Sequence, residues 1–494
     1  MIVGIDVGGT NTDAAIVSDE IKTIKLPNEI GIGGVLKEVS KHVDLKKEKL
    51  VVSTSLPLNL IISKFDEIKT LTLLIPGPGL NYSHLGVVLK GYVNHRGDVV
   101  EEIDESEIRK SLDGKYDNLA IAAKFSVRNS VLEEKVSKIA EEKFSKEKIA
   151  LSHFVGGLNY PARINTTVVN AKVKETAYRL TELIRSYAGD FYYFKGDGGI
   201  VPYKVVLENP SELYNSSPAA VALGASYLTG EKDALVVDIG GTSTDFVRLK
   251  DGMPVIVEGI DIAGRKTLIR CVDSFSIPFG GDSLVSDGKL RPERIDRPIA
   301  FGGSKFTLTD ALNCLGHEIG DYRASREAGR GIDSESVVDQ FISVVSENIA
   351  QTGYKRVIGA GYLAPILIPE ISRRCGADFV VPEHSEAVNA VGVAVSRLSL
   401  TIYARFDTEK GSAAFNGIVE ECPFRKGSIP DDSEIIEAAK GKIRKFAREL
   451  GASEEDIGRI RVIYYSSFVV VRGGIKRGII SDVVVQIEPG IREI

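Results

Sequence analysis

The chain has 494 residues, of which 43% are hydrophobic and 26% charged, and its formal net charge is −6. This composition is typical of a globular protein with more than one domain, and the acidic balance gives no global field that favours nucleic acid or an anionic membrane. Four widely spaced cysteines, a chain that enters a strand at once instead of a signal peptide, and no apolar run long enough for a membrane span lead us to expect a cytoplasmic protein.

A motif near the start of the chain recurs later in the sequence. Residues 6–13 read Asp-Val-Gly-Gly-Thr-Asn-Thr-Asp, and residues 238–245 read Asp-Ile-Gly-Gly-Thr-Ser-Thr-Asp. Each copy follows a short apolar run and precedes further strand-like residues. The pattern predicts a strand, a tight glycine turn and a second strand, built twice.

A turn of this composition is suited to bind phosphate. Paired glycines let the backbone approach a ligand, and successive N–H groups with threonine hydroxyls form a concave anion site. The sequence therefore predicts that a nucleotide is held by two sets of residues: Gly8, Gly9, Thr10, Asn11 and Thr12, and Gly240, Gly241, Thr242, Ser243 and Thr244. The alternative is that both copies are ordinary hairpin turns.

The carboxylates that flank each turn are candidate catalytic groups. Asp6 and Asp238 end their strands beside the predicted phosphate position, where a carboxylate holds Mg²⁺ through its waters. We expect both to be metal and water ligands, unless they only cap a turn. Asp13 and Asp245 trail the turns, and they either take part in catalysis or brace the hairpin by accepting backbone N–H bonds.

Strands and helices alternate along most of the remaining chain. Strands are predicted at 50–55, 71–75, 119–125, 191–194 and 356–360, and helices at 31–42, 130–148, 170–187, 218–228, 334–352 and 385–399. Gly359 and Gly361 follow an apolar strand, where glycines would let a flat base lie against the backbone; a plain strand-to-helix turn is the alternative. From residue 401 a strand, a charged helix and two further strands suggest a small α+β module.

This order predicts an α/β protein with two related lobes around a cleft. We expect a first lobe at 1–170 with the first phosphate hairpin, and a second at 171–400 with the second hairpin and the adenosine turn. The C-terminal α+β module would occupy residues 401–494.

The two hairpins and the later Gly-Ala-Gly resemble the actin and sugar-kinase superfamily of ATPases. More narrowly, the chain resembles the hydantoinase/oxoprolinase A family, ATP-using subunits that open cyclic amides. The matching motifs run in order along most of residues 1–400: 6–13, 53–55, 95–97, 163–170, 197–199, 218–220, 238–245 and 307–311. The resemblance implies two ribonuclease-H-like lobes around an ATP cleft, with ATP and Mg²⁺ as cofactors.

The chain also departs from the family pattern. The family usually has Ser-Gly-Pro-Ala where this chain has Ser216-Ser217-Pro218-Ala219, and its Gly-Ala-Gly-Gly-Gly-Ser loop is shortened here to residues 279–283. A Pro-Gly-Pro-Ala-Cys-Tyr-Gly stretch expected before Thr307 is absent. These departures touch the substrate site more than the nucleotide site.

The resemblance implies an ATP-dependent hydrolase that acts on a hydantoin or 5-oxoproline. Transfer of the γ-phosphoryl group to the amide oxygen would make a leaving group that water displaces before the ring opens. The catalytic residues would be Asp6, Asp13, Asp238 and Asp245, and substrate contacts would come from His95, Arg96, Arg163, Thr166 and Asn170. The resemblance makes a B-type subunit the expected partner, and we also expect an oligomer.

Two other functions fit the same residues. A small-molecule kinase on this fold would use a carboxylate base to activate a substrate hydroxyl, and a nucleotide-dependent activator or scaffold would bind ATP without catalysis. His95 with Arg96 could equally be a solvated surface pair.

Overall fold

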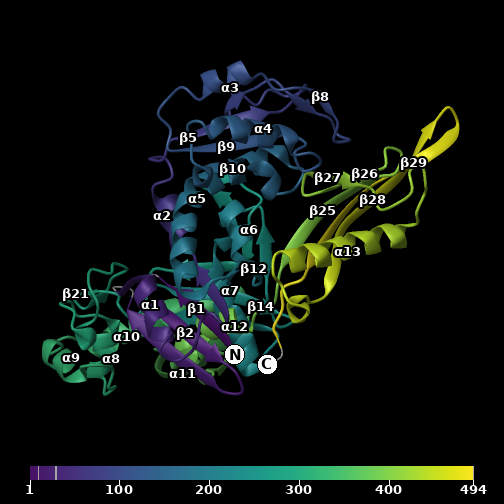
Figure 1. The fold of residues 1–494 in the computed structure, drawn as a ribbon. Helices are drawn as coiled ribbons and strands as arrows, with labels where there is room; N and C mark the ends of the chain where they lie inside the picture. The colour runs from purple at the N-terminus through teal and green to yellow at the C-terminus, as the bar shows by residue number, and fades with distance from the viewer. Residues whose placement is uncertain (9–10, 28–29, 493–494) are drawn as a thin grey trace.

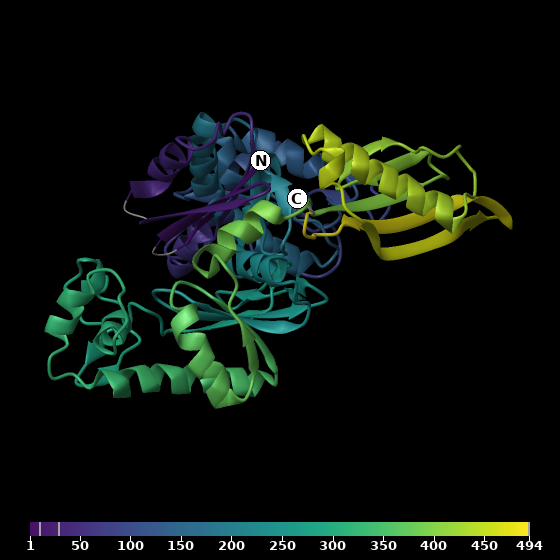
Figure 2. The same cartoon turned by 90° about the horizontal axis from the view of Figure 1, so that it is seen from below.

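The computed structural model describes residues 1–8, 11–27 and 30–492. Two α/β lobes form the base of the molecule, a smaller domain rises above the first lobe, and a C-terminal module stands beside both (Figures 1 and 2). None of the described helices is long and apolar enough to cross a membrane.

The first lobe is a six-stranded sheet with the order β12-β11-β4-β1-β2-β3. β1 and β2 form the first hairpin, β3 extends it antiparallel, and β4 and β11 continue parallel to β1. β1 is apolar and buried along nearly its whole length, as expected for a central strand with both faces covered. The bounds are β1 Ile2–Val7, β2 Asn11–Val17, β3 Ile21–Pro27, β4 Lys49–Thr54, β11 Tyr192–Phe194 and β12 Ile200–Pro202.

The second lobe repeats this plan. β13 and β14 form the second hairpin, β20 lies antiparallel to β14, and β23 and β24 continue parallel to β13. The same strand order around the same hairpin confirms the predicted α/β fold of two related ribonuclease-H-like lobes. The bounds are β13 Ala234–Ile239, β14 Thr244–Lys250, β15 Met253–Pro254, β20 Ser274–Ile277, β23 Arg356–Ala360 and β24 Asp378–Val380.

Two helices, α7 (Ser216–Thr229) and α12 (Val388–Val395), lie between the two sheets and share one core with both. They approach so closely that a Cβ on Gly224 would overlap the carbonyl oxygen of Val388, and one on Gly392 would overlap that of Ala220. A Cβ on Gly4 of β1 would meet the carbonyl oxygen of Ala390 in the same way. The spacing between the lobes is therefore set by backbone contacts, which glycine alone permits.

A smaller domain is inserted between β4 and α5, the long helix Tyr160–Ala188. Its four-stranded sheet has the order β10-β9-β5-β6. The bounds are α2 Leu56–Ser63, β5 Thr70–Ile75, β6 Val87–Val88, β7 Tyr92–Val93, β8 Val99–Glu101, α3 Glu105–Ser111, β9 Asn118–Ala123, α4 Val131–Ala140 and β10 Ile149–Leu151. The boundary predicted at 170/171 lies inside α5, and β11 and β12 after it belong to the first sheet. We therefore propose a boundary between β12 and β13 instead.

The second lobe has its own additions after the hairpin. Short strand pairs precede a helical segment, and α10 and α11 then pack beside β23. The bounds are β16 Ile256–Glu258, β17 Asp261–Ile262, β18 Arg265–Lys266, β19 Arg270–Val272, β21 Val285–Ser286, β22 Lys289–Leu290, α8 Leu308–Cys314, α9 Tyr322–Ala328, α10 Ser334–Thr352 and α11 Ala364–Cys375.

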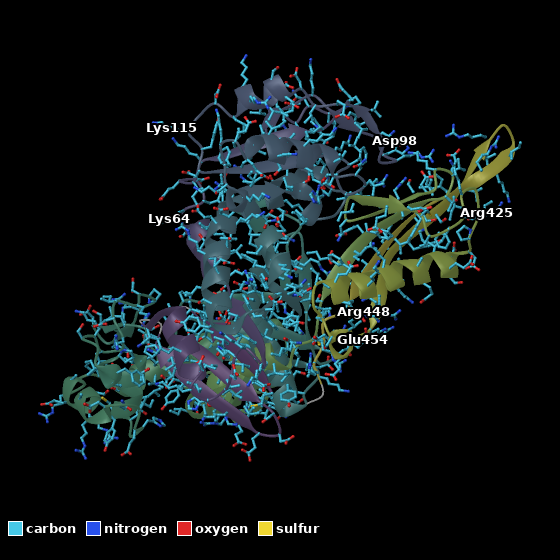
Figure 3. All side chains as sticks on the ribbon, viewed as in Figure 1. Lys64, Asp98, Lys115, Arg425, Arg448 and Glu454 are labelled. Carbon is cyan, nitrogen blue, oxygen red and sulfur yellow. The ribbon has the colours of Figure 1, made fainter. Side chains whose placement is uncertain are left out.

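The C-terminal module is a five-stranded antiparallel sheet in the order β27-β26-β25-β29-β28, with α13 packed on it. It meets the inserted domain through charged side chains: Asp98, labelled in Figure 3, pairs with Lys410 at 2.5 Å. The bounds are β25 Leu400–Asp407, β26 Ser412–Phe415, β27 Ile418–Glu421, α13 Asp432–Glu449, β28 Ile460–Arg472 and β29 Ile475–Ile487.

Three predicted helices have different bounds. α5 begins at Tyr160 instead of 170, because Asn159 caps it by accepting a hydrogen bond from the Ala162 N–H and Pro161 stands in its first turn. The helix predicted at 130–148 ends at Ala140, and the one at 385–399 is only α12, since β25 starts at Leu400. The remaining early and middle helices are α1 Gly31–Val39 and α6 Tyr203–Glu208.

Candidate active site

The two hairpins are closed in the same way. In the first, the Gly8 N–H donates to the carbonyl oxygen of Asn11 at 3.1 Å; in the second, the Gly240 N–H donates to that of Ser243 at 3.0 Å. Asp6 faces Asp13 across the first strand pair, and Asp238 faces Asp245 across the second. The sequence repeat is therefore matched by a repeat of the closing hydrogen bond and of the strand pairing.

The predicted phosphate-binding residues differ in what they already contact. Gly9 and Thr10 lie outside the described residues. The Thr244 side chain is already hydrogen-bonded, because its hydroxyl donates to the carbonyl oxygen of Phe279 at 2.8 Å. Asn11 and Ser243 occupy equivalent, half-buried positions, and nothing in the described part of the chain bonds to their side chains. These two side chains are free to bind an anion.

The shortened glycine loop, residues 279–283, packs directly on the second turn. The Gly281 N–H donates to the carbonyl oxygen of Gly240 at 2.9 Å, and the Asp282 N–H donates to that of Gly241 at 2.8 Å. A Cβ on Gly280 would stand 2.5 Å from the Gly240 carbonyl oxygen, so only glycine allows this approach. The loop therefore holds the second turn in place through these backbone hydrogen bonds.

Asp6 is fully buried and surrounded by hydrogen-bond donors. The Ser217 hydroxyl donates to its Oδ2 at 2.7 Å, and the Asn389 amide donates to the same oxygen at 2.9 Å. Burial raises the pKa of Asp6, and bonds from Ser53, Ser217 and Asn389 oppose that rise. Asp6 Oδ1 is buried, and no described residue donates a hydrogen bond to it.

Asp13 is tied to the same group of donors. Its Oδ2 accepts a bond from Asn389 at 3.0 Å, so one amide joins both carboxylates of the first hairpin. Lys25 on β3 forms an ion pair with Asp13 Oδ1 at 2.8 Å. In the first hairpin, the trailing aspartate therefore contacts an amide and an ammonium group from other elements.

The second hairpin has few donors. Asp238 is half-buried, and no hydrogen bond reaches its carboxylate from the residues that the structure describes. Burial, with repulsion from Asp245, raises the pKa of Asp238 to about 7. Burial also raises the pKa of Asp245, against one hydrogen bond from Ser276.

The carboxylates of both hairpins act on one another across the space between the lobes. Asp6 and Asp13 each raise the pKa of Asp238, and Lys25 lowers it. Because such charge effects fade beyond a Debye length of about 10 Å, the two strand ends lie close to one another. A cation placed there would relieve the repulsion.

The residues fit Mg²⁺ in one limited sense. Among residues 1–8, 11–27 and 30–492, no three His, Cys, Asp or Glu side chains gather closely enough to hold a metal by themselves. Mg²⁺ is, however, commonly held by one or two carboxylates together with phosphates and water. The oxygens available to Mg²⁺ are Asp6 Oδ1, to which no described residue donates a hydrogen bond, and those of the half-buried Asp238 carboxylate.

The predicted adenosine turn is closely packed. A Cβ on Gly361 (φ +92°) would overlap the Ile239 carbonyl oxygen, and one on Gly359 would stand 2.7 Å from the Ile368 side chain. These glycines let β23 approach the second hairpin and α11. Their contact with a base stays a prediction.

The predicted substrate residues do not gather at the hairpins. Arg96 binds Asp407 (2.9 Å) and Glu409 (2.8 Å) of the C-terminal module, and His95 is exposed. Arg96 thus joins the inserted domain to that module.

Arg163 is wholly buried and engaged. Its guanidinium donates to the carbonyl oxygens of Ala123 and Lys124, each at 2.6 Å, and to the Ser152 hydroxyl at 3.2 Å. This pattern ties α5 to the inserted domain.

Thr166 and Asn170 belong to a different place from the hairpins. The Thr166 hydroxyl accepts a bond from the Leu268 N–H at 2.8 Å, and the Asn170 amide donates to Asn209 at 2.7 Å. Thr166 and Asn209 line a separate cavity between α5, α6 and the C-terminal module.

Three residues at the site were not predicted from the sequence. Lys25 and Asn389 have no motif, and only the fold brings them to the first hairpin. Ser217 carried a signal, because it stands where the resembling family has glycine.

Two sequence profiles match the chain: hydantoinase/oxoprolinase over residues 163–352, and the hydantoinase/oxoprolinase N-terminal region over residues 78–144. The chain belongs to the hydantoinase/oxoprolinase family. This membership confirms the resemblance found in the sequence.

Two curated proteins are similar to the chain in sequence. Caprolactamase subunit alpha of Pseudomonas jessenii is 23% identical over 385 residues, covering 66% of this chain and 55% of the relative. The acetophenone carboxylase gamma subunit of Aromatoleum aromaticum (strain DSM 19018 / LMG 30748 / EbN1) is 24% identical over 263 residues, covering 46% and 35%. The matches thus span about half or less of each relative.

Two solved structures share the fold over the whole chain. Nucleotide-free acetone carboxylase superposes with a TM-score of 0.69 at 17% identity, and ATP-dependent caprolactamase from Pseudomonas jessenii with 0.67 at 19%. Each comparison covers 100% of this chain and 88% of the other.

Proposed function

We propose that this member of the family is the ATP-using subunit of an enzyme that activates and opens a small cyclic amide of the hydantoin or lactam type. The observation that carries the proposal is the meeting of two equivalent hairpins, whose carboxylates act on one another across one cleft. A triphosphate has the length and charge to contact both turns. The ATP-dependent caprolactamase of Pseudomonas jessenii, which is similar to this chain in sequence and in fold, supports the substrate class.

The proposed reaction has three steps. The amide oxygen attacks the γ-phosphorus of ATP; an O–P bond forms, the bond to the β-phosphate oxygen breaks, and ADP leaves. One water then adds to the activated carbon, and the ring C–N bond breaks while the nitrogen takes a proton, which leaves a ring-opened acyl phosphate. A second water adds to the acyl carbon, a carboxylate forms, and inorganic phosphate leaves with the former amide oxygen. ATP thereby converts a poor leaving group into a good one, and the protein contributes positioning and charge neutralisation.

The residues divide this work. The backbone N–H groups of the turns, with Asn11 and Ser243, would hold phosphate oxygens. Asp6 and Asp238 would hold Mg²⁺, which neutralises phosphate charge when it is bound. Asp238 has a pKa near neutrality, so it is suited to orient or deprotonate the attacking water at physiological pH.

A partner subunit belongs to the proposal. The curated relatives are named as the alpha subunit and the gamma subunit of their enzymes, which supports a multi-subunit assembly with a B-type subunit. An oligomer, a cytoplasmic location and a small-molecule substrate in place of nucleic acid remain predictions from the sequence.

A second candidate function is ATP-dependent activation of a ketone. Similarity to an acetophenone carboxylase subunit and to acetone carboxylase supports it. The same cleft would then act on a ketone oxygen in place of an amide oxygen.

Isotope transfer tests the proposal directly. A lactam labelled with ¹⁸O at its carbonyl is incubated with Mg-ATP, the chain and, where the neighbouring reading frame encodes it, the B-type subunit. We expect the label to appear in inorganic phosphate.

Four outcomes would contradict the proposal in different ways. Phosphate free of label excludes phosphorylation of the amide oxygen. A stable phosphorylated product supports the kinase instead, and labelled phosphate from a ketone but not from a lactam supports the second candidate. Calorimetry that finds no binding of adenine nucleotide at millimolar concentration ends the argument for all three.

A further inference from the structure

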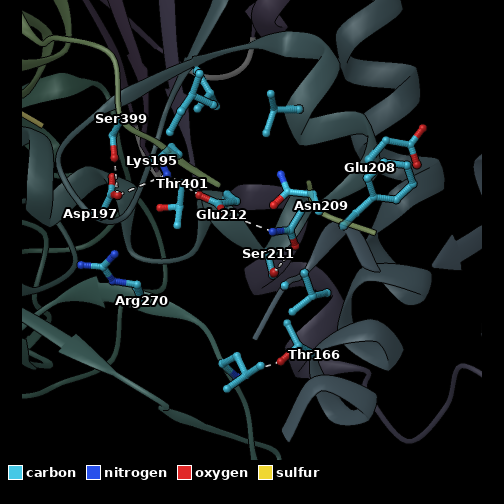
Figure 4. Close-up of a pocket in the computed structure, with 18 of the residues that line it drawn as sticks. Thr166, Lys195, Asp197, Glu208, Asn209, Ser211, Glu212, Arg270, Ser399 and Thr401 are labelled. Carbon is cyan, nitrogen blue, oxygen red and sulfur yellow. Dashed lines mark hydrogen bonds and ion pairs between the residues drawn. The ribbon is translucent and has the colours of Figure 1, made fainter. Parts of the chain in front are cut away.

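A cavity of about 340 Å³ lies where the first lobe, the second lobe and the C-terminal module meet. Its wall is built from the turn between β11 and β12, from α5, α6 and β19, and from β25 and α13 (Figure 4). The volume is within the range of small-molecule binding pockets, and a junction of domains is a common place for one. The residues proposed to hold the phosphates and Mg²⁺ do not line this cavity.

The charged groups of the wall are already neutralised. Lys195 pairs with Asp197 at 3.2 Å and with Glu212 at 2.5 Å, and Figure 4 shows the contact of Lys195 with Asp197. Arg270 pairs with Glu258 at 2.9 Å, and Glu208 pairs with Lys174 at 2.6 Å. Lys204 also lines the cavity, but it is exposed and therefore remains hydrated.

These pairings select against a charged ligand. Apart from the exposed and hydrated Lys204, an additional buried charge would find no free counter-charge among the described residues of the wall, and its desolvation would cost several kcal/mol in a site of this kind. The rest of the wall is largely apolar and includes Leu268, Leu400 and Phe446. An uncharged, partly apolar molecule is the ligand that fits.

Three polar groups of the wall are free to orient such a molecule. No partner for the Thr401 hydroxyl, the Tyr403 hydroxyl or the Asn416 amide nitrogen exists in the described part of the chain. Burial raises the pKa of Tyr403, so its hydroxyl keeps its proton and remains a donor. Donors of this kind match a carbonyl oxygen, and the Thr401 oxygen can accept from a ring N–H.

The cavity is connected to the phosphate site through one short segment. Ser211 and Glu212 line the cavity, and Ser217, a few residues later in the first turn of α7, donates to Asp6. The turn with Lys195 and Asp197 leaves the end of β11, which lies two strands from β1 in the same sheet. Two strand spacings amount to about 10 Å.

From these observations we infer that the cavity is the binding site for an uncharged cyclic amide and that it excludes ring amides carrying a carboxylate, such as 5-oxoproline. The inference rests on the proposed function for its substrate class. The Asp-Gly-Gly turn at 197–199 thereby gains a role: it neutralises Lys195 and shapes the wall, with the Ser399 hydroxyl donating to Asp197 at 2.8 Å.

Ligand-observed NMR with ε-caprolactam and 5-oxoproline as probes tests the inference on the full chain. Val205→Phe fills the cavity from α6, and Leu207→Phe is the matched control, because Leu207 is also half-buried on α6 but does not line the cavity. We expect caprolactam to bind the wild type and the control, with binding at least tenfold weaker in Val205→Phe. We expect 5-oxoproline to bind at least tenfold more weakly than caprolactam to the wild type.

A second variant keeps the test valid if Val205→Phe does not fold. Tyr403→Phe removes one hydroxyl and no volume, and we expect it to weaken caprolactam binding severalfold while the affinity for a non-hydrolysable ATP analogue stays unchanged. Equal caprolactam binding by wild type, Val205→Phe and Tyr403→Phe overturns the cavity assignment, as does an absence of binding to the wild type. Preference for 5-oxoproline overturns the exclusion of charged ligands. All these outcomes are separable from failure of the proposed function, which appears as absent nucleotide binding or absent isotope transfer.

Discussion

The two hairpins have nearly the same sequence and the same closing hydrogen bond, yet their carboxylates lie in opposite surroundings. Asp6 and Asp13 share the Asn389 amide, and Ser217 and Lys25 add a donor and a cation. Asp238 has no hydrogen-bond donor among the described residues, and repulsion adds to burial in raising its pKa to about 7.

A duplicated motif therefore need not have a duplicated role. The backbone of each turn is set by its glycines, but the protonation of each aspartate is set by side chains from other elements. The first hairpin is arranged to hold a carboxylate in place. The second is arranged to exchange a proton near neutral pH.

The largest expected effect separates the two aspartates by activity. Asp238→Asn should lower ATP turnover on the order of a hundredfold or more while nucleotide affinity changes little, because a charge-positioning group is lost. Steady-state turnover and calorimetric titration measure the two quantities. Asp233→Asn, at an exposed position just before β13, is the control and should behave as wild type. Wild-type turnover by Asp238→Asn would remove its assigned role.

The next effect concerns stability against pH. Native Asp238 keeps its proton up to about pH 7, whereas the unfolded chain releases it near pH 4, so stability should fall as pH rises between these values. Asp238→Asn should abolish this part of the dependence and be more stable than wild type at pH 8, on the order of 2 kcal/mol. Thermal unfolding at pH 5 and pH 8 without nucleotide measures it. A wild type that gains stability over this range would contradict the raised pKa.

A smaller effect tests the cation between the hairpins. Lys25→Met should raise the pKa of Asp238 further, because Lys25 is the charge that lowers it. The ascending limb of the pH–turnover profile should move toward alkaline pH. Lys22→Met, exposed on the same strand, is the matched control. Superimposable profiles for both variants would show that Lys25 does not reach across the cleft.

The smallest effect is expected from removing the Ser217 hydroxyl, which donates a hydrogen bond to Asp6. Ser217→Ala should weaken Mg-ATP binding about fivefold, since one hydrogen bond to a carboxylate is worth about 1 kcal/mol or somewhat more. Ser217→Gly introduces the residue usual in the family and should match Ser217→Ala if the hydroxyl alone matters. Unchanged affinity in both would reduce Ser217 to a packing residue.

The sequence was sufficient to predict the lobes and the hairpins because their signals are local. A glycine turn between apolar runs dictates its own backbone, and two copies predict two lobes. Helix ends were less predictable: α5 begins ten residues before the prediction, since the capping signal of Asn159 with Pro161 was not recognised.

The side chains around the hairpins could not be predicted, for a topological reason. Asn389 reaches Asp6 across 383 positions of sequence, and Ser217 across 211. The predicted substrate residues show the converse: Arg163 has a family motif, but the structure uses all of its guanidinium to join α5 to the inserted domain. A motif thus indicated that a residue matters without indicating what it contacts.

The close approach of α7 and α12 sets the distance between the two lobes. Where side chains separate two helices, substitutions of those side chains change the distance between the helices. Here Gly224 and Gly392 contact opposing main-chain carbonyl groups directly, so no side chain sets this distance. While both glycines are kept, the distance between the two hairpin turns can therefore stay constant as the surrounding sequence changes. Under the proposed function, substrate preference could then diversify in the cavity and the C-terminal module without changing the distance that a triphosphate would span.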